Sequence, residues 1–177
     1  MNIKNIVRVF LLAVAVIIVV NSSGRMYAND YPIKQDPHIH AGFIVVKDGQ
    51  LQDFSDPMYM KIEPCALDSH DDLTPEEQQL EKAHLHDGVG DVVHVHREGA
   101  TWGDLFENAG ISFDEDLITY INGNPYEGNI YNKEIESYES LVIFEGDEPL
   151  DKESYLDQSI TRERIEEVEK ISESCSE

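Results

Sequence analysis

The stretch HIHAGFIVV, residues 38–46, decides how this chain is expected to fold. Its β-branched and aromatic residues favour a strand. The Asp48-Gly49 pair that follows is a strong hairpin signal, because the preferred tight turn needs a positive φ at both positions. A short return strand is predicted at residues 51–54, so the folded part of the chain is expected to open with a β-hairpin.

An inserted helix and a second hairpin come next in the sequence. The helix is expected to begin at Thr74 as its cap, with Glu77 completing a capping box, and to end near residue 83. The hairpin pairs HLH at 84–86 with VVHVH at 92–96, across a turn rich in glycine and aspartate. The alternation of residue types in both arms predicts strands.

A further helix and two apolar strands complete the predicted domain. Thr101 caps a helix that ends at Gly110, and strands are expected at 117–122 and 140–145. The core order is ββαββ with an inserted helix and a histidine-rich hairpin, which predicts an α+β fold with a small mixed sheet. This order resembles the β-grasp, ubiquitin-like pattern, an analogy that implies a fold and no function.

The terminal segments divide the chain into four parts. Residues 1–28 are expected to be a signal peptide or an uncleaved signal-anchor, because Lys4 and Arg8 flank the start of an apolar run that ends at Val20. This run is shorter than the roughly 20 residues of a membrane-spanning helix. Its flanking charges predict export to the outer face of the cytoplasmic membrane, the periplasm or the extracellular space. The other predicted parts are a linker at 29–37, a histidine-rich domain at 38–150 and a charged helical tail at 151–177.

The charge balance limits the classes of partner. The chain of 177 residues has 13 basic and 36 acidic side chains, which gives a net charge of -23. A nucleic acid partner and an anionic membrane surface are disfavoured, because both require a basic protein surface. The same acidity favours solubility and also concentrates cations near a site. Cys65 and Cys175 are too few for a disulfide framework, although one bridge between them stays open in an oxidising compartment.

Six of the seven histidines fall into three His-x-His pairs, and these pairs are the candidate functional residues. Side chains at i and i+2 of a strand point to the same face, so each pair presents two imidazoles a little under roughly 7 Å apart along the strand. That separation suits two ligands of one metal ion. The predicted metal ligands are His38, His40, His84, His86, His94 and His96.

The register of the second hairpin decides whether its histidines cooperate. If His84 faces His94 across the turn, all the hairpin histidines share one face. If His86 faces Asp91 instead, the two pairs point to opposite faces, because a slip of one residue reverses every side chain. We predict the first register. It leaves Asp87 and Asp91 in the turn, as extra ligands or as acceptors for an imidazole N–H.

The ligand type limits the metal. Imidazole-rich sites suit zinc, copper, nickel or iron, and we expect zinc first and copper second. His70, in an acidic loop, and Cys65 are further candidate ligands outside the main set. An acid-responsive cluster and unrelated surface histidines are the alternatives to a metal site.

The motifs between His38 and Gly110 form a set: HIH at 38–40, Cys65, HLHD at 84–87, Gly90 with His94, and TWGDLF at 101–106. This set resembles a group of poorly characterised, membrane-anchored bacterial and archaeal domains. The resemblance covers under half of the chain. It implies the architecture and the histidine cluster, and it brings no activity to transfer.

Three functions fit these patterns. The main hypothesis is an exported, membrane-tethered domain that stores, senses or transfers zinc or copper. The first alternative is a zinc- or iron-dependent enzyme, either a hydratase, a hydrolase or a cupin-like protein, in which three protein ligands leave an open position on the metal. The second alternative is a surface interaction domain with a structural metal, whose site would be closed and four-coordinate.

Overall fold

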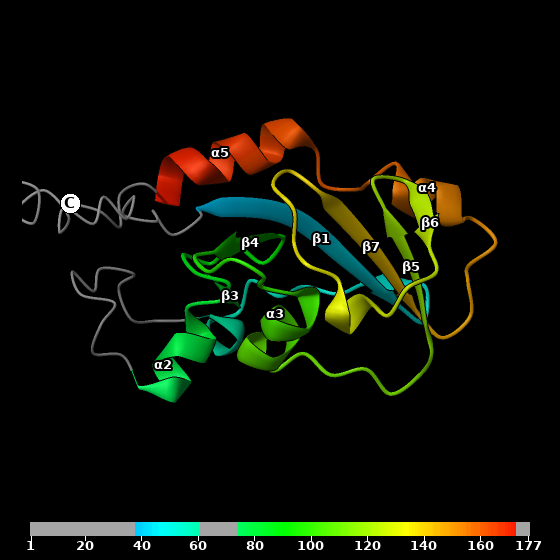
Figure 1. Ribbon diagram of the computed structural model, residues 1–177. Helices are drawn as coiled ribbons and strands as arrows, with labels where there is room; N and C mark the ends of the chain where they lie inside the picture. The colour runs from blue at the N-terminus through cyan, green and yellow to red at the C-terminus, as the bar shows by residue number, and fades with distance from the viewer. Residues whose placement is uncertain (1–37, 61–73, 173–177) are drawn as a thin grey trace, which may run out of the picture. The chain divides into compact units, whose positions relative to one another are not determined.

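Seven strands form one mixed sheet in the computed structural model, which describes residues 38–60 and 74–172. The strands are β1 (Ile39–Lys47), β2 (Gln50–Leu51), β3 (Ala83–His84), β4 (Val92–Val95), β5 (Leu117–Ile121), β6 (Asn124–Tyr126) and β7 (Ser140–Glu145). Their order across the sheet is β3-β4-β1-β7-β5-β6, with β2 paired to β1 (Figure 1). β1 runs antiparallel to β4 and parallel to β7, which makes the sheet mixed.

Four α-helices accompany the sheet in the described part of the chain. They are α2 (Pro75–Leu80), α3 (Trp102–Ala109), α4 (Lys152–Leu156) and α5 (Arg162–Ser172), together with the 3-10 turns η1 (Pro57–Tyr59) and η3 (Ile130–Asn132). The capping boxes predicted at Thr74 and Thr101 both form, and Gly110 ends α3 in the left-handed conformation at φ 66°. The predicted α+β class with a mixed sheet is confirmed.

Several element boundaries differ from the prediction, and the strands β3, β4 and β5 each end one or two residues earlier than expected. Helix α2 ends at Leu80 rather than near residue 83, because Ala83 pairs with Val95 in the sheet as the first residue of β3. The return strand β2 has only two residues. Phe54, expected at the end of that strand, instead stacks on Phe43 in the core, with ring centroids 5.6 Å apart.

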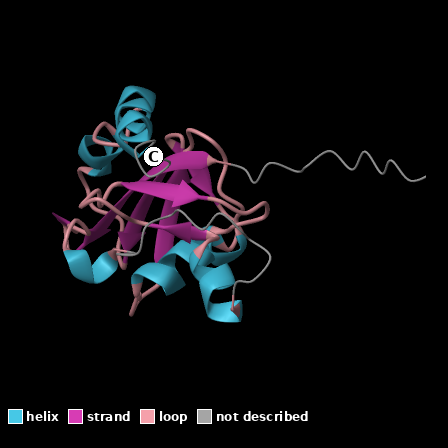
Figure 2. Cartoon of the chain, turned by 90° about the vertical axis from the view of Figure 1, so that its left-hand side faces the viewer, coloured by secondary structure: helices cyan, strands magenta, loops and turns pink. Residues whose placement is uncertain are grey.

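The main hydrophobic core lies between the sheet and α3. Ala41, Phe43 and Val45 of β1 point to this face and are buried together with Trp102 and Phe106 of α3. Figure 2 shows helices on both sides of the sheet, so β1 is covered on both of its faces. The residues of β1 that alternate with these three therefore point to the opposite face of the sheet.

The opposite face is covered by α4 and α5, both from the segment predicted to be a charged tail. Ile165 and Val168 of α5 are 0% and 4% exposed and pack against Val92. The link between the two helices crosses β1 at Gly42, where an added Cβ would lie 2.3 Å from the Cβ of Ile160. The described part of this segment is therefore a layer of the fold, since a narrow apolar stripe within a charged sequence docks it on the sheet.

Several predicted features fall on residues that the structure does not describe: the signal segment 1–28, the linker 29–37, Cys65, His70 and Cys175. Among the helices of residues 38–60 and 74–172, none combines the length and the apolar character needed to cross a bilayer.

Candidate metal centre

Pairing across three strands brings the histidines into rows. His84 of β3 lies opposite His94 of β4, and His94 lies opposite His40 of β1. Directly opposite residues share a face, so these three side chains form one row across the sheet. The register predicted for the second hairpin is confirmed.

The other three histidines flank this row on the same face. Ile39 lies opposite Val95, so His38 and His96 come next to each other, with ring centroids 5.2 Å apart. On the other side of the row, the centroid of His86 lies 4.5 Å from that of His94. The structure thus gathers all three His-x-His pairs into one cluster, on the face that α5 covers.

Two groups within this cluster have the geometry to hold a metal ion. One is His38, His40 and His94, and the other is His84, His86 and His94. In each group, one nitrogen from every ring lies within 4.8 Å of the others. Two ligands on opposite sides of one ion would be about 4 Å apart, at roughly 2.1 Å for each zinc–nitrogen bond. The spacing of the three nitrogens in each group is therefore close to the spacing of ligands around one metal ion.

Hydrogen bonds orient two of these rings toward the cluster. His84 donates from Nδ1 to the carbonyl oxygen of Leu80 at 3.0 Å, and His86 donates from Nδ1 to the Asp87 carboxylate at 2.7 Å. A ring whose Nδ1 carries the proton has its lone pair on Nε2, which is the form that binds a metal. Asp87 therefore takes the predicted place of an acceptor for an imidazole N–H.

His94 lies at the centre of the cluster and is 3% exposed. Its Nε2 contacts Nε2 of His38, and its Nδ1 contacts Nε2 of His86. Burial lowers the pKa of His94 well below the ordinary value for histidine, and the neighbouring His40 lowers it further. The ring is neutral at physiological pH, so its lone pair is available to a metal.

His40 is equally buried, and a carboxylate from α5 lies near it. Burial, and then the adjacent His38, lower the pKa of His40 to about 4. Its Nδ1 lies 3.7 Å from Oε1 of Glu169, and the other oxygen of that carboxylate accepts a hydrogen bond from Tyr138 at 3.0 Å. Sequence reasoning missed Glu169. Its position four residues after Ile165, on the same helical stripe, was the available sign that it faces the sheet.

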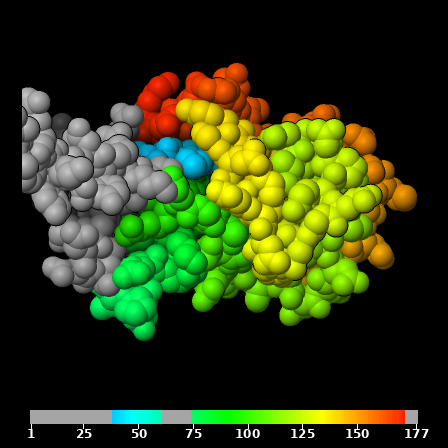
Figure 3. Space-filling model, viewed as in Figure 1, coloured from blue at the N-terminus to red at the C-terminus, as the bar shows by residue number. Residues whose placement is uncertain are grey.

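Helix α5 is fixed over the cluster by contacts at its first turns. Arg164 donates from Nε and Nη2 to the two carboxylate oxygens of Asp91, each at 3.0 Å. The Arg162 guanidinium lies 4.0 Å from the ring centroid of Tyr138. Figure 3 shows α5 against the segment that leads into β7, which contains Tyr138. Asp91, a predicted extra ligand, thus faces Arg164 and belongs to neither histidine group.

His96 also stands apart from the two groups. Its ring stacks on His94 with centroids 4.6 Å apart, yet it supplies no nitrogen to either group. Its backbone N–H donates to the carbonyl oxygen of Lys82 at 3.3 Å. The structure therefore brings five of the six predicted ligands into the two groups and places the sixth beside them.

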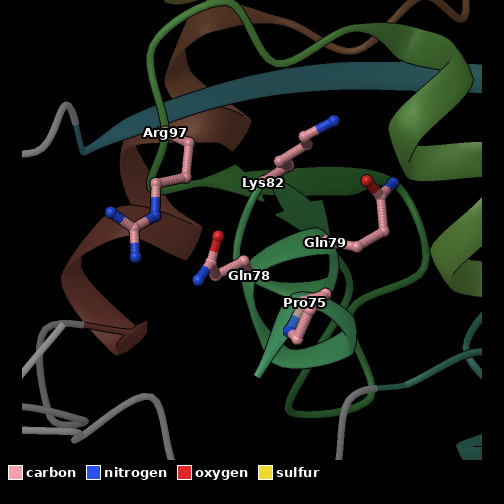
Figure 4. A pocket seen from close by; sticks show the side chains of 5 residues that line it. All are labelled: Pro75, Gln78, Gln79, Lys82 and Arg97. Carbon is pink, nitrogen blue, oxygen red and sulfur yellow. The ribbon is translucent and has the colours of Figure 1, made fainter. Parts of the chain in front are cut away.

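A pocket of about 450 Å³ lies next to the second hairpin and is lined by Pro75, Gln78, Gln79, Lys82 and Arg97 (Figure 4). Lys82 precedes β3 and Arg97 follows His96, so two cations flank the hairpin on this side. Lys82 also donates to the Asp104 carboxylate at 2.8 Å. Among the described residues, the lining contains no histidine, and none of its residues belongs to either group.

Comparison of the chain with models of known protein families, with curated proteins and with solved structures found no match, so the histidine cluster itself is the basis for inferring a function.

Proposed function

We propose that this chain is an exported, membrane-tethered transition-metal-binding protein that stores, senses or transfers zinc or copper. The observation that carries the proposal is the gathering of three His-x-His pairs on one sheet face, with two groups of three imidazoles within 4.8 Å. Neutral imidazole is a good ligand for both metals.

The surroundings of the cluster support reversible binding. His38 is exposed, whereas His40, His84 and His94 are at most 3% exposed. An ion thus has an entry point at the edge of the cluster and buried ligands behind it. The net charge of -23 raises the local concentration of cations around the protein.

The proposed location comes from the sequence. Basic residues before an apolar N-terminal run support export, with residues 1–28 as a cleaved signal or a retained anchor. The resemblance to membrane-anchored bacterial and archaeal domains supports the same location.

A zinc- or iron-dependent enzyme is the second candidate, and one observation favours it. Each group has three histidines, the number of protein ligands that catalytic zinc sites use while keeping a position for water. The hydratase and hydrolase alternatives depend on this open position. A metal-handling protein needs no substrate pocket, and for that reason we place it first.

The experiment is elemental analysis of the full chain, purified without a histidine tag from medium rich in zinc and copper. We expect at least one tightly held equivalent of either metal. The absence of retained metal, together with an unchanged melting temperature on adding zinc or copper, would contradict the proposal. Hydration or hydrolysis that requires the bound metal would favour the enzyme instead.

A further inference from the structure

We infer that His94 bridges two metal ions, one held with His38 and His40 and the other held with His84 and His86. This inference rests on the proposed metal-binding function and specifies the site that performs it. The product would be a dinuclear centre with one shared imidazole.

The position of His94 in the sheet makes it the common member. β4 lies between β3 and β1, so His94 has a histidine on each neighbouring strand directly opposite it. The two groups that could hold a metal share this residue and no other. Neither group reaches three ligands without it.

The two nitrogens of His94 face different groups. Its Nε2 contacts His38 and its Nδ1 contacts His86. The two ring nitrogens of an imidazole point away from each other in the ring plane, so one ion cannot bind both. Two ions can, one at each nitrogen.

The other rings of the second group are arranged as terminal ligands. His84 and His86 each use Nδ1 to donate to an oxygen, from Leu80 and Asp87 respectively, which leaves one nitrogen for a metal. Both nitrogens of His94 face imidazole nitrogens. This contrast distinguishes a bridging ring from the terminal ones.

Each group also has its own carboxylate. Asp87 accepts from His86 at 2.7 Å in the second group, and Glu169 lies 3.7 Å from His40 in the first. A carboxylate beside a ligating imidazole increases its basicity and offsets the charge of the ion. The presence of one carboxylate beside each group fits two metal sites better than a single metal site.

Filling both sites involves a defined proton. The first ion binds the unprotonated nitrogen of neutral His94. The second ion binds the remaining nitrogen, whose N–H bond breaks, and the proton leaves to solvent. The ring then bridges as an imidazolate. No electrons are transferred, so the step needs no oxidant or reductant.

The test loads the full chain, without a histidine tag, with copper(II) and measures bound copper and electron paramagnetic resonance. We expect two equivalents, with an integrated signal well below that of two independent copper(II) ions, because an imidazolate couples their spins. One equivalent would overturn the bridge and keep the proposed function. Zero equivalents would overturn both. Two equivalents at full, uncoupled intensity would overturn the bridge alone.

Matched variants assign the sites. His38→Gln with His40→Gln, and separately His84→Gln with His86→Gln, should each retain one copper with a full single-ion signal. His94→Gln should retain neither copper ion when it is loaded and measured in the same way. Circular dichroism checks that this variant is folded. Retention of two equivalents in His94→Gln would contradict the inference. If that variant does not fold, the two paired variants and the signal of the unsubstituted chain still decide.

Discussion

The sheet face beneath α4 and α5 is built from different side chains at its two ends. Toward β5 and β7, Val142 and Phe144 pack with Tyr155 of α4 in an apolar cluster. Toward β3 and β4, imidazoles occupy the equivalent layer. The depth is the same, since Phe144 and His40 are each 1% exposed. The apolar end stabilises the fold by burial, whereas buried polar rings cost free energy unless they find partners. Metal binding and protonation of the imidazoles should therefore change stability at the histidine end and leave the packing of the apolar end unchanged.

The largest effect is expected at the apolar end. Phe144→Ala removes a ring that packs edge-on against Tyr120 and Tyr155, with centroids 5.9 and 6.0 Å away. We expect a loss of about 3–5 kcal/mol in the free energy of unfolding, as for other buried phenylalanines. Chemical denaturation with and without zinc should give the same loss. A loss that depends on zinc would show that the two ends are coupled.

Metal should stabilise the histidine end by a comparable amount. At a free concentration about a thousand times the Kd, one site that binds only the folded chain adds about 4 kcal/mol. The increment should persist in Phe144→Ala and disappear in His94→Gln, because distant sites act independently. Thermal denaturation with zinc and with excess chelator measures it. An unchanged increment in His94→Gln would contradict the site.

Acid should destabilise the metal-free protein through the same cluster. The pKa of His40 is about 4 when folded and 6.5 when unfolded, so below pH 6.5 the unfolded chain binds a proton that the folded chain does not. This contribution is fully present above pH 6.5 and is lost as the pH falls to 4, by about 3 kcal/mol in total. The pKa of His94 is shifted in the same direction, which steepens the loss.

His40→Gln is the control for this pH dependence, because glutamine is polar and does not titrate in this range. Unfolding free energies of the variant and the unsubstituted chain should converge as the pH falls from 6.5 to 4. The comparison cancels the titration of the many carboxylates, which both proteins share. Parallel profiles would mean that His40 takes up its proton over the same pH range in the folded and unfolded states.

The same contrast explains what the sequence could and could not predict. The pairing of His84 with His94 followed from alternation and the length of one turn, which are local properties. Glu169 and Arg164 could not be predicted in this way, because Arg164 and Asp91 are 73 positions apart and meet only after α5 docks. The apolar stripe of Ile165 and Val168 was present in the sequence, but the charged residues around it led to the prediction of a charged tail.

The smallest effect on stability is expected where α5 is attached to the turn of the histidine hairpin. Arg164→Met removes the paired hydrogen bonds to Asp91, whose side chain is 33% exposed, against 40% for Arg164. Solvent screening limits the loss to at most about 1 kcal/mol, and less in high salt. Lys170→Met, which also replaces a cation of α5 with methionine but at an exposed position, should stay within about 0.5 kcal/mol.

Arg164→Met should increase the rate of metal release clearly, although it lowers the free energy of unfolding only slightly. Asp91 lies in the turn between His86 and His94. Without its hydrogen bonds to Arg164, α5 can open locally over the ligands with little change in the free energy of global unfolding. Stopped-flow transfer of zinc to a coloured chelator should therefore be faster in Arg164→Met than in Lys170→Met. Equal rates would mean that ions leave past the exposed His38 without movement of α5, and that the helix contributes to the fold alone.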